Sequence, residues 1–360
     1  MWKDTAITRR LKLAAPIVQG PFGSGLSAVD LVVAVSESGG LGSFGVHHLD
    51  GGGIRQVAGE IRARTARPFA LNLWLPLGDS DDPQLSDARW SAACELLRPY
   101  FIELGVPMPA RPARFGPRFE EQLETVLELK PPVFSFIFGV PAPHVLERCR
   151  RDGIVTVGTA TTPAEAKLLD EAGVDAIVAT GFEAGGHRVS FLMEPEDCLT
   201  GTLALVPQVV DTVKAPVIAA GGMADGRGIA AALELGASAA QIGTAFLACE
   251  ESNAAPLHRD KLFSVDARRT TLTRAFTGRL ARSVHNGFID AMRGQQAVLA
   301  PYPVHAWLTA RLRGAALAAG RTDLVSLWSG QGAPLLKHRR ARELFASLVA
   351  ETDSALGSAR

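Results

Sequence analysis

The sequence has neither an excess of charge of one sign nor a long apolar run, two features that define other classes of protein. Its 37 Lys and Arg residues are balanced by 37 Asp and Glu residues, so it lacks the basic excess that nucleic acids and anionic membranes select. No apolar run approaches the roughly 18 residues of a membrane span, and the opening MWKDTAITRR lacks the apolar segment of a signal peptide. We therefore expect a cytoplasmic globular protein with neither a nucleic-acid nor a membrane partner.

Cysteine is also sparse, and several catalytic motifs are missing. The four cysteines form no CxxC pair and have no histidine at ligand spacing, which predicts buried free thiols rather than a disulfide framework or a zinc site. The G-x-S-x-G, H-E-x-x-H, Walker and G-x-G-x-x-G patterns do not occur. His47 and His48 lack further ligands at metal spacing, so we predict that they lie in a solvated loop.

What the sequence does contain is an alternation of short apolar runs and amphipathic helical patterns, which is typical of a parallel α/β protein. The runs are continuously apolar, as expected for strands that are covered on both faces. The predicted strands are Leu13–Gln19, Leu41–Val46, Phe69–Leu75, Val133–Phe138, Ile154–Val157, Ala176–Ala179, Val217–Ala220 and Ala239–Ile242. Repeated βα units over about 250 residues predict a (β/α)8 TIM barrel, with a doubly wound open sheet as the alternative.

Helix signals lie between these strands. Ser27 is a candidate N-cap, Asp225 is another, and Thr162 with Glu165 forms a potential capping box. Two segments exceed a minimal barrel, one after the third predicted strand and one after the last. We predict a discontinuous barrel of residues 1–78 and 115–248, with residues 79–114 and 249–360 forming a smaller helical accessory domain over the C-terminal mouth.

The residues with chemical potential follow the predicted strands, where a barrel places its active site. Gly221 and Gly222 follow the seventh strand, and Gly243 and Thr244 follow the eighth. Glycine lets backbone N–H groups approach an anion closely, and helix N-termini add partial positive charge. The paired loops therefore predict a phosphate site, whereas either loop alone is equally compatible with a tight turn.

Further candidates surround this predicted phosphate site. His187 follows the Gly185-Gly186 pair after the sixth strand, where it either faces a bound ring as a base or donor or bonds within its own loop. Asn72 interrupts an apolar strand, and a buried amide must find hydrogen-bond partners either in the barrel or on a ligand. The same two alternatives apply to the amide of Gln241, at the end of the eighth predicted strand. The turn around Pro21 leaves the first strand with backbone groups that could meet a flat cofactor.

These segments, taken in order, resemble the nitronate monooxygenases, formerly called 2-nitropropane dioxygenases. The resemblance spans nearly the whole chain, although FMN-dependent enoyl-ACP reductases and NADH:quinone reductases share much of it. It is carried by the runs PIVQGP, NL, FSF with FG, EAGGH, AGG with DGRG, and QIGTAF, and by PYP and WSGQG near the C-terminus.

The resemblance implies a non-covalently bound FMN on a TIM barrel, with His187 as the catalytic residue near the reactive edge of the flavin. The residues that it assigns to the cofactor are Pro21, Asn72, Thr180, Gly185, Gly186, Gly221, Gly222, Gln241, Ile242, Gly243 and Thr244. The chain departs from the family pattern twice. Thr180 stands where members often carry glutamine, and Val189 stands where glycine is common.

The implied activity is the oxidative denitrification of alkyl nitronates, such as propionate 3-nitronate, to a carbonyl compound and nitrite with consumption of O2. Neutral nitroalkanes would need a base, for which His187 is the candidate. The alternative on the same scaffold is an NAD(P)H-dependent reductase of quinones or enoyl thioesters. Two further alternatives come from other functional classes. One is a flavin-binding protein without turnover, and the other is a phosphate-binding barrel isomerase.

Overall fold

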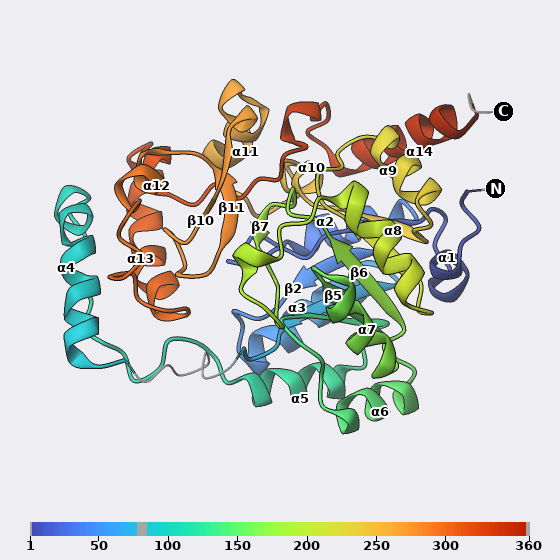
Figure 1. The fold of residues 1–360 in the computed structure, drawn as a ribbon, viewed down its shortest axis with the longest axis horizontal. Helices are drawn as coiled ribbons and strands as arrows, with labels where there is room; N and C mark the ends of the chain where they lie inside the picture. Colours follow the sequence, from blue (N-terminus) through green and yellow to red (C-terminus); the bar gives the residue numbers. More distant parts are fainter. Residues whose placement is uncertain (1, 78–84, 358–360) are drawn as a thin grey trace.

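The core of the protein, in a computed structural model that describes residues 2–77 and 85–357, is a closed parallel barrel (Figure 1). The eight strands run in the order β1-β9-β8-β6-β5-β4-β3-β2, and a bridge between Val18 and Leu41 joins the two ends. There the Gln19 N–H donates to the Leu41 carbonyl over 2.9 Å. The barrel strands are β1 (Ile17–Gln19), β2 (Gly42–Gly45), β3 (Phe69–Trp74), β4 (Val133–Ile137), β5 (Val155–Ala160), β6 (Ala176–Thr180), β8 (Val217–Ala220) and β9 (Ala239–Ile242). The predicted TIM barrel is confirmed, and the open-sheet alternative is wrong.

Helices surround the barrel and bury the outer faces of its strands (Figure 1). These are α2 (Val29–Glu37), α3 (Gly51–Arg64), α5 (Phe119–Leu129), α6 (Pro143–Asp152), α7 (Pro163–Glu171), α8 (Thr202–Thr212), α9 (Gly226–Glu234) and α14 (Ala341–Gly357). Inside the barrel, Ile7 and Leu11 of α1 (Ala6–Leu11) belong to one buried cluster with strand residues such as Val133 and Ile218. Helix α1 therefore closes the end of the barrel opposite the C-terminal ends of the strands.

The helix caps agree with the sequence in part. Asp225 accepts hydrogen bonds from the N–H groups of Arg227 and Gly228, as an N-cap should. Thr162 caps α7, but the carboxylate of Glu165 accepts from the Thr161 N–H and not from its own N-cap. The prediction for Ser27 is wrong, because Ala28 is the N-cap of α2 and no side chain caps this helix.

Ser27 has a different task from capping. Its hydroxyl accepts from the N–H groups of Phe22 and Gly45 and donates to the Phe22 carbonyl, all at 3.0 Å. One buried hydroxyl thus ties the turn that follows β1 to the end of β2. That turn contributes to the mouth of the barrel.

A second group of elements covers one side of the mouth. Its helices are α4 (Asp87–Glu103), α10 (Thr244–Leu247), α11 (Pro256–Phe263), α12 (Gly287–Ala291) and α13 (Val304–Ala318), with short 3-10 turns η1 (Pro195–Asp197), η2 (Val265–Arg268), η3 (Thr322–Leu324) and η4 (Ala333–Leu335). Helix α4 packs against α13, although more than 200 residues separate their ends (Figure 1). A separate buried cluster fills this region.

A small antiparallel sheet attaches this region to the barrel, and it was not predicted from the sequence. It has the order β10-β11-β7, from β10 (Thr270–Thr273), β11 (Ala281–Val284) and β7 (Gly186–His187). In its register, Ala281 pairs with His187 and Arg282 pairs with Gly186. The loop after β6 is thereby held as a strand across the mouth.

The division into a barrel and an accessory domain remains a prediction. Its first boundary, at residues 78–79, lies outside the described residues. Beyond the last boundary, after residue 248, helix α14 packs mainly on the barrel helices α9 and α2. All four cysteines are free and buried, as predicted. No helix within residues 2–77 and 85–357 is long and apolar enough to cross a membrane.

Candidate active site

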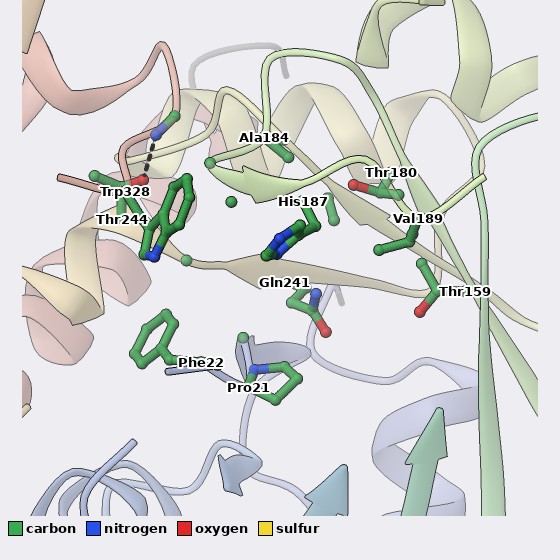
Figure 2. A pocket seen from close by; sticks show the side chains of 18 of the residues that line it. Pro21, Phe22, Thr159, Thr180, Ala184, His187, Val189, Gln241, Thr244 and Trp328 are labelled. Carbon is green, nitrogen blue, oxygen red and sulfur yellow. Dashed lines mark hydrogen bonds between the residues drawn. The ribbon is translucent and has the colours of Figure 1, made fainter. Parts of the chain in front are cut away.

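A cavity of about 1280 Å³, a volume that includes open solvent at its entrance, lies at the C-terminal ends of the barrel strands (Figure 2). The structure brings together almost all of the predicted site residues in its wall. These are Pro21, Asn72, Thr180, Gly185, Gly186, His187, Gly221, Gly222, Gln241, Gly243 and Thr244. The exception is Ile242, whose fully buried side chain belongs to the cluster of Ile17 and Phe246 behind the wall.

The loops after β8 and β9 form a concave surface made largely of backbone. Gly221 and Gly222 have φ values of +111° and +71°, a region that L side chains rarely adopt. A Cβ at Gly221 would lie only 2.8 Å from Thr202 Oγ1. At Gly243, by contrast, a Cβ would meet no protein atom within 4 Å. Because Gly243 lines the cavity, a side chain there would occupy the space that the cavity leaves for a ligand.

The loop after β6 is anchored by Glu183, a residue whose role the sequence analysis missed. The first residue of α8, Thr202, has no side-chain cap from its preceding Gly201. Instead the Glu183 carboxylate accepts from the Thr202 N–H at 2.9 and 3.0 Å and from the Thr202 hydroxyl at 3.0 Å. A carboxylate at a helix N-terminus is favourable because it complements the helix dipole. Gly181 permits this contact, since a Cβ there would lie 2.1 Å from Thr202 Oγ1.

Two buried guanidinium groups hold the same loop from the other side. Arg188, only 1% exposed, donates to the carbonyls of Gly181 at 2.8 Å and Thr180 at 3.2 Å. Burial lowers the pKa of Arg188 to about 10, which leaves it charged at neutral pH. Arg282 donates through Nε to the Phe182 carbonyl over 2.9 Å. Charged donors to carbonyls make stronger hydrogen bonds than neutral ones, so this backbone is rigidly placed.

His187 is held by a hydroxyl of the accessory region. Its Nε2 lies 2.9 Å from Thr277 Oγ1. That hydroxyl donates to the Arg279 carbonyl at 3.1 Å and accepts from the Arg279 N–H at 3.3 Å. The single hydroxyl proton is thus already used, so the hydrogen-bond network assigns the proton of the imidazole to Nε2. Nδ1 is left with the lone pair.

The imidazole of His187 is neutral. Burial, followed by the nearby positive charge of Arg279, lowers its pKa to about 3. Its ring makes a T-shaped contact with the ring of Trp74, with the centroids 5.0 Å apart and the planes at 74°. A neutral ring with its N–H committed to Thr277 can accept a proton through Nδ1 but does not supply a positive charge.

The amide candidate in the barrel wall has a partner within the barrel and also lines the cavity. Asn72 Nδ2 donates to Ser135 Oγ over 3.0 Å, across the paired strands β3 and β4. Both readings left open by the sequence therefore apply to Asn72, which is buried and borders the ligand space. Gln241 is half-buried and lies in the wall next to His187 in the view of Figure 2.

Several wall residues were not predicted as site residues, and they come from distant parts of the chain. The Gly330 N–H donates to Thr244 Oγ1 over 2.8 Å, which joins the segment at Trp328–Gly330 to the loop after β9 (Figure 2). A Cβ at Gly330 would lie 2.9 Å from the Glu183 carbonyl, so the close approach needs glycine. The WSGQG run was the available signal for this contact. The two departures from the family pattern, Thr180 and Val189, lie together with Thr159 in one part of the wall (Figure 2).

A second cavity, of about 960 Å³, adjoins the first. Trp74, His187 and Ser24 line both. His47 also lines the second cavity and stacks on Trp74, with centroids 3.8 Å apart and planes at 8°. His47 lies in the turn that follows β2, as predicted, but it is half-buried rather than solvated, and burial lowers its pKa well below its ordinary value. His48 is exposed, as predicted.

The fold and the site define a class of protein: a (β/α)8 barrel enzyme whose cavity is lined by glycine-bearing loops after its last two strands, with a neutral histidine in the same wall. Comparison with known proteins narrows the class. The sequence profile described as nitronate monooxygenase matches residues 5–351. A probable nitronate monooxygenase of Staphylococcus aureus (strain Newman) is 36% identical over 353 residues, covering 97% of both chains.

Two solved structures resemble the whole chain. A nitroalkane oxidase from Streptomyces ansochromogenes has a TM-score of 0.88 and 38% identity, covering 99% of this chain and 100% of the other. FabK from Thermotoga maritima has a TM-score of 0.74 and 27% identity, covering 99% and 98%. The chain belongs to the nitronate monooxygenase family and is a flavin-dependent oxidoreductase.

Proposed function

We propose that the protein binds FMN and oxidises alkyl nitronates, such as propionate 3-nitronate, to a carbonyl compound and nitrite with O2 as co-substrate. The observation that carries this proposal is the pairing of a backbone anion cradle with a neutral histidine whose N–H is already engaged. The likeness to a nitroalkane oxidase over the whole chain supports it.

The residues present fit FMN. Gly221, Gly222, Gly243 and Thr244 would hold its phosphate, because their backbone is concave and Gly243 leaves free space above its Cα. The Gly185-Gly186 backbone would help, while Asn72, the Pro21 backbone, Thr180 and Gln241 would face the ring. Ile242 would support the cradle from behind. The bound flavin supplies the redox chemistry, and the chain supplies position, polarity and a proton acceptor.

His187 has a defined part in this proposal. A nitronate has already lost its α-proton, so its oxidation needs no base. A neutral nitroalkane must lose that proton, and Nδ1 of His187 would accept it while Nε2–H stays on Thr277. With a pKa of about 3, His187 is in its basic form at every physiological pH. A protonated His187 that neutralises a substrate anion is not compatible with this environment.

The test is an anaerobic titration of the flavin-loaded protein with propionate 3-nitronate, NADH and NADPH in separate experiments. The absorbance of the flavin should change with the nitronate and not with either nucleotide. Admission of O2 should then restore the spectrum and release nitrite. Rapid bleaching by NADH or NADPH, with no response to nitronate, would replace the proposal with a reductase of quinones or enoyl thioesters.

A further inference from the structure

The second cavity opens beside the proposed base and has a largely aromatic wall. Ser24, Trp74 and His187 line both cavities, so the two spaces meet at the imidazole. The rings in the wall come from β3 and from the segments at the starts of α5 and α13, and they are Trp74, Phe115, Phe119, Tyr302 and Trp307. A substrate that extends past His187 into this cavity would therefore meet aromatic side chains.

Two of these rings are held in place by the accessory region. Phe115 and Trp307 meet nearly at right angles, with centroids 5.7 Å apart and planes at 86°. Trp90 of α4 packs against both, with its centroid 6.0 Å from that of Phe115 and 6.2 Å from that of Trp307. The guanidinium carbon of Arg311 lies 3.3 Å from the ring centroid of Trp307. These contacts set the wall of the cavity before any ligand enters.

Several polar side chains in the same wall are already engaged by the protein. The Gln122 amide donates to two backbone carbonyls, at 2.8 and 2.6 Å. The Thr277 hydroxyl is saturated, as described above. The Arg279 guanidinium packs on two rings, with its carbon 4.4 Å from the centroid of Phe138 and 4.1 Å from that of Tyr302. A polar ligand group would compete with these partners, whereas an apolar group would leave them intact.

The ring of Trp74 lies where the two cavities meet, and it is fixed by two histidines. His47 stacks on it, with centroids 3.8 Å apart and planes at 8°, and His187 makes the T-shaped contact described above. Both imidazoles are neutral, because burial lowers the pKa of each. Aromatic pairs at such angles are more favourable than their buried area alone accounts for. The passage between the cavities therefore favours a ring over an aliphatic group of the same bulk.

We propose that the second cavity binds an aromatic group of the substrate, so that the enzyme prefers nitronates whose alkyl chain ends in an aryl ring. The inference rests on the proposed function and deepens it, because it names the substrate class of that same site. The nitronate carbon would lie beside His187 in the first cavity, and a short linker would pass Trp74. Small nitronates would react without the contacts of the second cavity.

The binding test compares 3-phenylpropanoate with propanoate, in which a carboxylate replaces the nitronate group and no reaction can follow. The charge is the same in both, so the ratio of their dissociation constants reports the ring alone. Calorimetric titration of the flavin-loaded protein should give at least about 10-fold tighter binding of 3-phenylpropanoate, as expected for burial of a phenyl group.

Two variants place a bulky side chain in the second cavity. Ala306→Phe changes a half-buried lining residue of α13, and Gly116→Phe changes an exposed lining residue whose Cβ would meet no protein atom within 4 Å. Each should reduce the preference for 3-phenylpropanoate to less than about 3-fold. Ala310→Phe is the matched control, because Ala310 is exposed on the same helix and does not line the cavity. This variant should keep the full preference.

The kinetic test uses the nitronates of 2-phenylnitroethane and nitroethane. Ala306→Phe should lower kcat/KM for the first by at least about 10-fold, through KM, and for the second by less than about 3-fold. Equal losses with both nitronates, or a preference for 3-phenylpropanoate that is absent from the natural chain or unchanged in both cavity variants, would overturn the inference. So would a gain in affinity with 3-cyclohexylpropanoate and none with 3-phenylpropanoate, since the cavity would then take aliphatic groups.

The two tests separate this inference from the proposed function. If neither nitronate is oxidised, the proposed function fails. The titrations with 3-phenylpropanoate and propanoate need no turnover, so they still decide whether the second cavity binds an aromatic group.

Discussion

The Thr277 hydroxyl lies 2.9 Å from Nε2 of His187 and is itself saturated by the backbone of Arg279, so it accepts the imidazole proton and cannot donate one back. This relationship gives His187 one tautomer, with the lone pair on Nδ1. Thr277 is a positioning residue, because it acts on the reaction through His187. It lies in the accessory region, 90 residues from the histidine.

The first prediction follows from this bond. Thr277→Val removes the acceptor and should lower kcat/KM for a neutral nitroalkane by about 10- to 100-fold, since general-base catalysis depends on the correct tautomer. Turnover of the matching nitronate should change by less than about 3-fold, because no proton is removed. Thr277→Ser keeps the hydroxyl and should behave like the natural protein.

Nitrogen-15 NMR of the imidazole gives a readout that a merely structural role would not move. The natural protein and Thr277→Ser should display the Nε2–H form of His187, and Thr277→Val should display a mixture of both neutral tautomers. Identical tautomer populations in all three proteins, or equal losses with nitroalkane and nitronate, would show that Thr277 does not act through His187.

The second prediction concerns stability and pH. His258 and His305 are almost fully buried, and their Nε2 atoms donate to the carbonyls of Trp328 at 3.1 Å and Ala275 at 2.8 Å. Burial lowers the pKa of each to about 4, against 6.5 as the ordinary value. Between these values the unfolded chain binds protons that the folded chain does not, so stability falls as the pH falls. From pH 7.5 to 5, each should cost about 2 kcal/mol of unfolding free energy.

Urea denaturation at pH 7.5 and pH 5 measures this loss. His305→Gln retains a nitrogen donor for the Ala275 carbonyl but has no titratable ring. Its stability should therefore decrease less with acidity than that of the natural protein, by about 2 kcal/mol over the same interval. An unchanged pH dependence in His305→Gln would mean that His305 is not held neutral in the folded state.

The sequence predicted the barrel well because its strands are buried on both faces and read as continuous apolar runs. The predicted strand boundaries are wrong where the apolar run and the strand do not coincide. Strand β5 extends beyond the predicted Val157 through Gly158 and Thr159, which are not apolar, and β1 begins only at Ile17 and not at the predicted Leu13. Ser27 looked like a cap because local sequence favours that role, but its hydroxyl bonds to Phe22 and Gly45 instead. Such a contact depends on a neighbouring strand, which local sequence does not encode.

Residues of the cavity wall could be predicted from the sequence where a glycine or a lone polar residue followed a predicted strand. They could not be predicted where their strand-pairing or hydrogen-bond partners lie far away in the sequence. Strand β7 has two residues, Gly186 and His187, and no alternating pattern, so its pairing with Ala281 and Arg282 left no local signal. Similarly, Thr277 is one of many threonines in the sequence, and only the folded chain places it on His187.

The third prediction tests the cradle by steric exclusion. Gly243 lines the cavity, its φ of −100° lies outside the left-handed region, and a Cβ there would meet no protein atom within 4 Å. Gly243→Leu should give a folded but colourless protein, with flavin affinity lowered by at least about 100-fold. Gly59 provides the matched control, because its Cβ in the exposed face of α3 also meets nothing within 4 Å. Gly59→Leu should purify with full flavin absorbance; equal flavin content in both variants would place the cofactor elsewhere.

The fourth prediction concerns Arg188, whose buried guanidinium binds the carbonyls of Gly181, Thr180 and Cys198. Arg188→Met keeps the aliphatic bulk but leaves these carbonyls without their donor, so urea denaturation should report a loss of about 2–4 kcal/mol. The flavin should also dissociate more readily, because the same backbone leads into the Gly185-Gly186 pair. Arg55→Met removes an arginine from an exposed pair with Glu128 and should cost less than about 1 kcal/mol. If the two variants are equally stable, Arg188 does not hold the loop, and the rigidity of the His187 segment must come from Arg282, Glu183 and the pairing of β7 with β11.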